Sequence, residues 1–185
     1  MTGIASKIDL SATGMWRLAI WGPAACLLLL PLVAMQFTEE VNWTGSDFAV
    51  FGTMLLIACG TCELALRMSR NLAYRAAVGV AVLAGFALVW INLAVGIIGS
   101  EANPANLMFA GVLVVGLLGA LSARFRPQGM AVALLATAAA QVAVGVIALL
   151  LGHDYTALIV GAFFAALWLV SAGLFRIAAQ QSPAA

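Results

Sequence analysis

No charged residue occurs in the stretch Met130-Ala-Val-Ala-Leu-Leu-Ala-Thr-Ala-Ala-Ala-Gln-Val-Ala-Val-Gly-Val-Ile-Ala-Leu-Leu-Leu151, whose only polar side chains are Thr137 and Gln141. Since an α-helix rises about 1.5 Å per residue, a helix of this length crosses the hydrocarbon core of a bilayer, which is about 30 Å thick. A surface helix of a soluble protein needs a polar face, and this stretch has none. The stretch therefore predicts a transmembrane helix.

Five further apolar stretches of similar length occupy most of the remaining chain. The six predicted spans are residues 15–36, 47–68, 74–98, 104–123, 130–151 and 155–175. Spanning strands are excluded, because a membrane barrel needs alternating segments of about ten residues and these stretches are apolar on every side. We expect the first span to be retained rather than cleaved as a signal peptide, because it is about 20 residues long. The sequence predicts an all-α integral membrane protein with one six-helix transmembrane domain over residues 1–185.

The composition agrees with a lipid environment. Hydrophobic residues make up 65% of the chain, charged residues 8%, and the mean hydropathy is +1.13. Soluble domains carry roughly 25% charged residues, so this chain cannot cover a water-facing surface. The net charge of +1 gives no field that would attract nucleic acid. We expect the lipid bilayer as partner, and the 18 glycines suit close helix packing within the chain, in a homo-oligomer or with other membrane proteins.

The charged residues alternate between the connections of the predicted spans. All eight basic residues fall on one side: Lys7, Arg17, Arg67, Arg70, Arg75, Arg124, Arg126 and Arg176. The other side holds the acids Glu39, Glu40, Asp47, Glu101 and Asp154. Because basic loops stay in the cytoplasm, this pattern predicts that both termini are cytoplasmic. The connections divide the chain into three helical hairpins of similar length, which arise either from duplication or from chance similarity.

Two stretches resemble a known group of proteins. They are Ala34-Met-Gln-Phe-Thr-Glu-Glu-Val-Asn-Trp-Thr44, followed by Asp47-Phe48, and Trp90-Ile-Asn-Leu-Ala-Val-Gly-Ile-Ile-Gly-Ser-Glu-Ala-Asn-Pro-Ala-Asn106. Both are similar to stretches of an uncharacterised family of small bacterial multi-pass inner-membrane proteins. The resemblance covers about the first two thirds of the chain. It implies a bacterial inner (cytoplasmic) membrane and implies no activity.

Five polar residues are candidates for an ion or solute pathway. Glu39, Glu40 and Glu101 lie in predicted outer loops, and carboxylates at the mouth of a pore select cations. Asn92 and Glu63 fall inside predicted spans, and an acid such as Glu63 is costly there and is by default a functional hypothesis. The sequence therefore suggests a pathway from the outer carboxylates past Asn92, which we place near the middle of its span, toward Glu63.

These and other polar residues also have structural interpretations. Glu63 lies four residues before Arg67, a spacing at which two helical side chains pair and neutralise each other. We expect Asp47, Asn103 and Asp154 to cap the starts of the helices that follow them, since such residues accept from free backbone amides there. Asn92 is also suited to hydrogen bonding between helices.

The sequence gives little support for redox chemistry at the cysteines or for a metal site. Cys59-Gly-Thr-Cys62 has the spacing of redox motifs, but a reactive thiolate needs a helix N-terminus and this pair falls inside a span. We interpret Cys59, Cys62 and Cys26 as buried apolar residues. His153 is the only histidine and has no ligand-type spacing to a carboxylate, so we predict no metal and no cofactor. No motif of catalytic chemistry is present, which favours a noncatalytic protein.

Two hypotheses of function follow. The first is a small cation or solute transport module, or a channel-like one, which requires a water-accessible path. The second is a noncatalytic membrane scaffold or accessory subunit of a larger membrane complex, which requires only a dry and closely packed bundle. The two differ in what they demand of the five pathway candidates, because a scaffold tolerates the neutralisation of each carboxylate.

Overall fold

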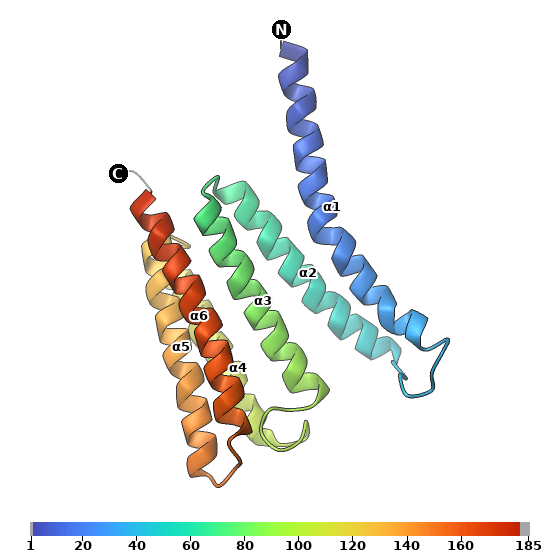
Figure 1. The fold of residues 1–185 in the computed structure, drawn as a ribbon, viewed down its shortest axis with the longest axis vertical. Helices are drawn as coiled ribbons and strands as arrows, with labels where there is room; N and C mark the ends of the chain where they lie inside the picture. The colour runs from blue at the N-terminus through green and yellow to red at the C-terminus, as the bar shows by residue number, and fades with distance from the viewer. Residues whose placement is uncertain (1, 182–185) are drawn as a thin grey trace. The chain divides into compact units, whose positions relative to one another are not determined.

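The computed structural model describes residues 2–181, with side chains from Gly14 onward, and this part of the chain contains helices and no strand (Figure 1). The elements are α1 (Thr2–Ala34), α2 (Gly45–Met68), α3 (Leu72–Ala94), the short 3-10 helix η1 (Pro104–Leu107), α4 (Met108–Ser122), α5 (Pro127–Leu150) and α6 (Thr156–Gln181). Six helical segments are long and apolar enough to cross a membrane, the first being Gly14–Ala34 within α1. The predicted all-α class and the number of candidate spans are confirmed.

The helices form two compact units, which divide between Leu64 and Ala65. Unit 1 contains α1 and most of α2, and unit 2 contains α3, η1, α4, α5 and α6. Each unit is described by itself below. The prediction of one six-helix domain stays a prediction.

In unit 1, α2 begins two residues before the predicted start because Thr44 caps it. The backbone N–H and the hydroxyl of Thr44 each donate to Oδ2 of Asp47, both over 2.7 Å. The backbone N–H of Asp47 donates back to Oγ1 of Thr44 over 3.4 Å. This reciprocal arrangement satisfies amides at the start of the helix. The ring of Trp43 packs edge-on against Phe48 and Phe51, with centroid distances of 5.2 and 5.4 Å, and fixes the entry of the chain.

In unit 2, α6 packs against α5 and α3, and α4 packs mainly against α5. The glycines make this packing close. A Cβ atom on Gly145 of α5 would lie 3.0 Å from Cα of Leu158 in α6, and a Cβ atom on Gly119 of α4 would lie 2.6 Å from Cβ of Ala133 in α5. Since α3 packs mainly on α6 and only slightly on α4, the predicted arrangement in three hairpins is not confirmed.

Helix α3 ends at Ala94, four residues before the predicted end at Ile98. The cause is Gly96, whose φ of +70° breaks the helix and whose missing Cβ lets the backbone of Ser100 approach. Ile97 and Ile98 then turn inward and are buried, with 3% and 1% of their surface exposed. An apolar run alone cannot distinguish a last helical turn from such a buried loop.

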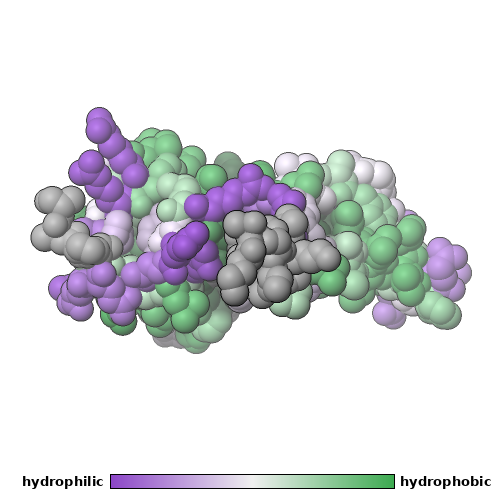
Figure 2. All heavy atoms as spheres, turned by 90° about the horizontal axis from the view of Figure 1, so that it is seen from above, coloured by the Kyte–Doolittle hydropathy of each residue, from purple (hydrophilic) through white to green (hydrophobic). Residues whose placement is uncertain are grey.

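The charges of unit 2 lie at its two ends. One end, called the basic end below, carries Arg67, Arg70, Arg75, Arg124, Arg126 and Arg176 at the end of α2, the start of α3, the α4–α5 connection and the end of α6. The other, called the acidic end, carries Glu101 and Asp154. Figure 2, which is seen from above the view of Figure 1, shows hydrophilic side chains over helix ends that face the viewer. The side chains of Lys7 and Asp9 lie outside the described residues, and the cytoplasmic placement of the termini stays a prediction.

The contrast between two glycines of α4 gives a test of this packing. Gly119→Ala places a methyl group against Ala133, whereas no atom lies within 4 Å of a Cβ at Gly111. We expect Gly119→Ala to lower the free energy of unfolding by about 1 to 3 kcal/mol through overpacking. Gly111→Ala should leave it unchanged or raise it by up to about 1 kcal/mol, because alanine favours the helix. Denaturation by SDS in mixed micelles measures both, and equal values for the two variants would contradict the packing of α4 on α5.

Candidate functional site

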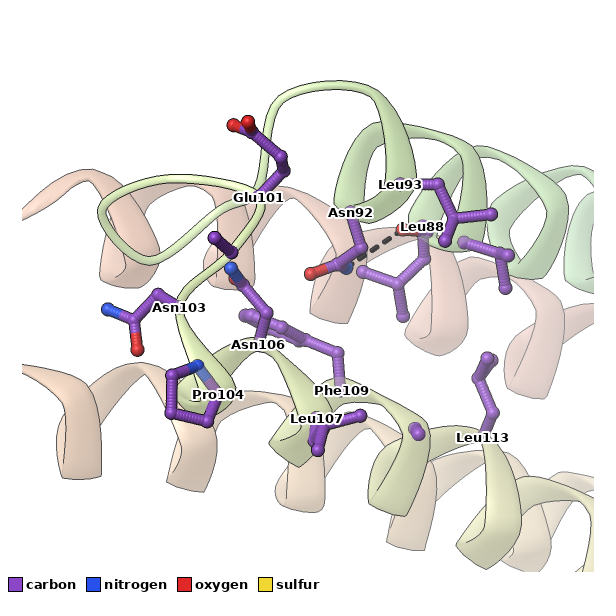
Figure 3. Close-up of a pocket in the computed structure, with 13 residues that line it drawn as sticks. Leu88, Asn92, Leu93, Glu101, Asn103, Pro104, Asn106, Leu107, Phe109 and Leu113 are labelled. Atoms are coloured by element: carbon purple, nitrogen blue, oxygen red, sulfur yellow. Dashed lines mark hydrogen bonds between the residues drawn. The ribbon is translucent and has the colours of Figure 1, made fainter. Parts of the chain in front are cut away.

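A pocket of ≈ 360 Å³ lies at the acidic end of unit 2, between α3, α4 and the loop that joins them (Figure 3). The pocket forms where it does because α3 and α4 contact each other less than the other neighbouring helices of unit 2 do. Most of its wall is apolar and includes Leu88, Leu93, Phe109 and Leu113. Four polar residues complete the lining: Asn92, Glu101, Asn103 and Asn106. The structure thus brings together two of the predicted pathway residues, Asn92 and Glu101.

Asn92 presents an unsatisfied acceptor to this pocket. Its Nδ2 donates to the carbonyl of Leu88 over 2.9 Å. Its Oδ1 is buried and has no hydrogen-bond partner within the described part of the chain. Leaving a buried acceptor unpaired costs about 1 to 3 kcal/mol. Because α3 ends at Ala94, Asn92 lies in its last turn, and the expectation that Asn92 lies near the middle of the span is wrong.

The neighbouring amides are already bonded to the backbone. Oδ1 of Asn106 accepts from the N–H groups of Ile97 and Ile98 over 3.0 and 2.9 Å, and its Nδ2 donates to the carbonyl of Ser100 over 2.7 Å. Oδ1 of Asn103 accepts from Ala105 over 3.0 Å. These bonds hold the loop between α3 and α4 in shape. The sequence did not indicate this role for Asn106. Of the three asparagine side chains that line the pocket, Asn92 is therefore the one whose Oδ1 accepts no hydrogen bond within the described part of the chain.

Glu101 lies at the rim of the pocket. It is exposed, and Figure 3 shows its carboxylate extending outward from the loop, above the space into which the Asn92 amide is turned. A carboxylate in this position makes the local potential negative and raises the local concentration of cations. The rim therefore favours a positively charged solute, while the wall favours an apolar group.

The middle of unit 2, behind this pocket, is closely packed. The hydroxyl of Ser171 in α6 donates to the carbonyl of Ala77 in α3 over 2.7 Å, and that of Thr137 donates to Ala133 over 2.9 Å. Gln141 in α5 is fully buried, with 0% of its surface exposed. None of these three polar side chains lines the pocket, which is therefore confined to the acidic end in this conformation.

Glu63 belongs to a separate polar cluster in unit 1. Nη2 and Nε of Arg17 donate to its Oε1 over 2.7 and 3.0 Å, and Nε1 of Trp21 donates to its Oε2 over 3.1 Å. The side chain of Glu63 is 17% exposed and that of Arg17 is 55% exposed. Sequence reasoning offered only Arg67 as a partner, because Arg17 lies 46 residues away on another helix. The cluster neutralises Glu63 and links α1 to α2.

The remaining pathway candidates, Glu39 and Glu40, are exposed in the connection between α1 and α2. The backbone N–H of Glu40 donates to Oγ1 of Thr38 over 3.2 Å. Both belong to unit 1, whereas the pocket belongs to unit 2. A continuous pathway through all five candidates stays a prediction.

Two of the three predicted caps are found: Oδ1 of Asn103 accepts from the N–H of Ala105, and Oδ1 of Asp154 accepts from the N–H of Thr156 at the start of α6, both over 3.0 Å. The prediction that Asp47 is the cap of α2 is wrong, because Thr44 caps this helix and the carboxylate of Asp47 accepts from Thr44. These bonds explain three of the polar residues near the ends of the predicted spans as structural, through the free amides of the first helical turn.

The cysteines are free, and Cys59 and Cys62 lie well inside α2 rather than at its start. Cys59 is buried, and its Sγ lies 3.7 Å from the carbonyl oxygen of Ile20 in α1. Cys62 is half-buried and Cys26 is exposed, so the expectation that Cys26 is buried is wrong. Among the described residues, no group of three or more His, Cys, Asp or Glu side chains is placed to hold a metal ion. The role of Cys59 as a small apolar residue between two helices stays our interpretation.

The Arg17–Glu63 contact can be measured by a double-mutant cycle with Arg17→Gln, Glu63→Gln and the double variant. We expect a favourable coupling of about 1 kcal/mol or less in the free energy of unfolding, because one partner is largely exposed. The matched control is a second cycle that pairs Arg17→Gln with Glu39→Gln. Glu39 follows the C-terminal end of α1, so this cycle should show no coupling. Equal coupling in both cycles would show that the contact adds nothing specific.

Comparison with known proteins gives no relative. No protein-family model, no curated protein and no solved structure matches this chain. The resemblance of residues 34–48 and 90–106 to small bacterial membrane proteins therefore stays a prediction. The function has to be argued from the chemistry of the pocket itself.

Proposed function

We propose that this chain is a multi-pass protein of a bacterial inner membrane that recognises a small organic cation in the pocket at its acidic end, as the binding step of a transport module. The observation that carries the proposal is the buried, unpaired Oδ1 of Asn92 in a pocket of ≈ 360 Å³. Such an acceptor is suited to a solute with an N–H donor, since that donor would satisfy it. The volume falls in the range of small-molecule sites, roughly 300 to 1,000 Å³.

The other residues of the pocket lining indicate which further groups the solute would carry. An apolar group of a few carbon atoms would pack against Leu93, Phe109 and Leu113, which supply most of the affinity through burial. A positive charge would remain near the rim, where Glu101 attracts it. These requirements describe a short alkyl ammonium or alkyl guanidinium ion.

The direction of uptake follows from the charges. Basic residues stay on the cytoplasmic side of a bacterial membrane, which puts the basic end of unit 2 in the cytoplasm and the pocket on the outer side. The close packing behind the pocket means that the described conformation is closed toward the basic end. Transport then requires a second conformation, and the sparse contacts between α3 and α4 make this pair the place where the bundle opens most easily.

Protection of an introduced thiol tests binding. In a background without Cys26, Cys59 and Cys62, Leu107→Cys places a thiol in the pocket lining, and Leu151→Cys places one in the other loop of the acidic end; the native side chains are 73% and 65% exposed. We expect butylguanidinium, a permanent cation with N–H donors, to slow labelling by a membrane-impermeant reagent at position 107 and not at 151. Tetraethylammonium, which has no N–H group, should protect neither. Protection of both positions, or of none, would contradict a site in this pocket.

Substitution of Asn92 separates binding from stability. Asn92→Leu replaces the unpaired acceptor by an apolar group of similar size, so we expect the free energy of unfolding to stay the same or rise by about 1 kcal/mol. Butylguanidinium binding should weaken about tenfold or more, since a hydrogen bond from a charged donor is lost. Glu101→Gln should weaken binding less, and its control Asp154→Asn, which removes the other carboxylate of the acidic end, should have no effect. A destabilised Asn92→Leu protein with unchanged binding would refute the role of Asn92.

A scaffold or accessory subunit is the second candidate, and the dry packing of α4, α5 and α6 favours it. Proteoliposomes that contain the intact protein separate the two. Uptake of labelled butylguanidinium that depends on Asn92 would support transport. Binding without uptake would reduce the proposal to a membrane protein that senses or holds the solute, and the search would then turn to partner proteins.

A further inference from the structure

The basic end of unit 2 carries more arginine side chains than the acidic end carries carboxylates. Its six arginines gather there, whereas Glu101 and Asp154, the only acidic side chains after Glu63, lie at the acidic end. At head-group depth, an excess of arginines attracts anionic phosphates. The arginines of the basic end therefore suggest a second ligand site, which is independent of the pocket at the acidic end.

One of these arginines already has a structural role. Nε of Arg75 donates to the carbonyl of Ser69 over 2.7 Å, and its Nη2 donates to that of Leu66 over 2.9 Å. These bonds satisfy carbonyls at the end of α2, which would otherwise lack partners. The side chain of Arg126, in contrast, makes no hydrogen bond or ion pair within the described part of the chain, and only its backbone is bonded, to Ala123 and Met130.

The loop that carries Arg126 is held in a fixed shape. Arg124 and Phe125 adopt left-handed conformations, with φ of 50° and 58°, which are unfavourable for residues other than glycine. The hydroxyl of Tyr74 donates to the carbonyl of Phe125 over 3.1 Å, and the Tyr74 ring packs edge-on against Phe175 at a centroid distance of 5.2 Å. The chain therefore presents Arg126 without further ordering of the backbone, which favours binding.

Arg126 borders a cavity of ≈ 240 Å³ between the ends of α2, α3, α5 and α6. Ser69 and Asn71 add polar groups to its wall, and Met68 and Phe125 add apolar ones. Oγ of Ser69 accepts from the N–H of Asn71 over 3.1 Å, so its hydroxyl hydrogen can donate to a ligand. Guanidinium and hydroxyl donors beside apolar carbons suit a phosphate group attached to a hydrocarbon chain.

We propose that this cavity binds a phosphate group, carried by an anionic lipid headgroup or present as free phosphate, through Arg126 and Ser69. The site rests on the membrane placement proposed above but uses none of the residues of the acidic-end pocket. Loss of phosphate binding and loss of organic-cation binding are therefore separate outcomes.

The test uses the full chain in detergent micelles and short-chain lipids as probes. We expect dihexanoyl phosphatidylglycerol to bind about fivefold tighter than dihexanoyl phosphatidylcholine, since one uncompensated arginine adds roughly that factor at a membrane surface. Arg126→Gln should remove this preference. The matched control Arg70→Gln deletes the same charge at the same end, outside the cavity lining, and should change the affinity less than twofold.

A second variant keeps the charge. Ser69→Ala removes a donor and should weaken phosphatidylglycerol binding about threefold, which a nonspecific attraction to the basic end would not show. Inorganic phosphate separates the sources: Arg126-dependent binding as tight as that of the lipid identifies free phosphate, and no binding identifies the headgroup. Equal losses in Arg126→Gln and Arg70→Gln, or no preference between the lipids, would overturn the proposal.

Discussion

Backbone polar groups in an apolar environment must find partners within the protein, and this constraint shapes several connections of unit 2. The connection after α3 is the clearest case. Its two isoleucines turn inward, and their N–H groups would be unpaired if Asn106 did not accept from both. The guanidinium of Arg75 and the hydroxyl of Tyr74 serve the loops of the basic end in the same way. A few long polar side chains thus allow short connections between helices that are apolar on all sides.

Close helix packing follows from the small residues, and it also determines where the bundle stays open. Gly145 and Gly119 let α5 approach α6 and α4, so these three helices form the tight part of unit 2. Helix α3 joins them through α6 and leaves space toward α4 at the acidic end. The pocket is therefore a consequence of unequal packing, and its unpaired Asn92 acceptor is the one feature of its wall that the fold itself does not use.

The two ends of unit 2 offer opposite chemistry. The acidic end combines an exposed carboxylate with a buried amide oxygen, and the basic end combines an uncommitted guanidinium with a hydroxyl. Both places are mixed with apolar side chains, which is the surface expected where helix ends meet the polar boundary of a bilayer. Unit 1 contains an ion pair between two helices. Arg17 of α1 neutralises Glu63 of α2, and Trp21 of α1 donates a hydrogen bond to the same carboxylate.

The sequence by itself determined the helical class, the six candidate spans, the separation of charges and the caps at Asn103 and Asp154. These depend on local composition, helix length and the preferences of first-turn amides, which neighbours along the chain can specify. Only the tertiary structure decided the Arg17 and Trp21 partners of Glu63, the early end of α3 and the placement of Asn92 and Glu101 in the lining of one pocket. Arg17 is remote from Glu63 in sequence, and the Ile97 and Ile98 loop looks like helix until Gly96 and Asn106 are seen together. Contacts between distant segments depend on which helices pack together, and uniformly apolar helices carry little information about that choice.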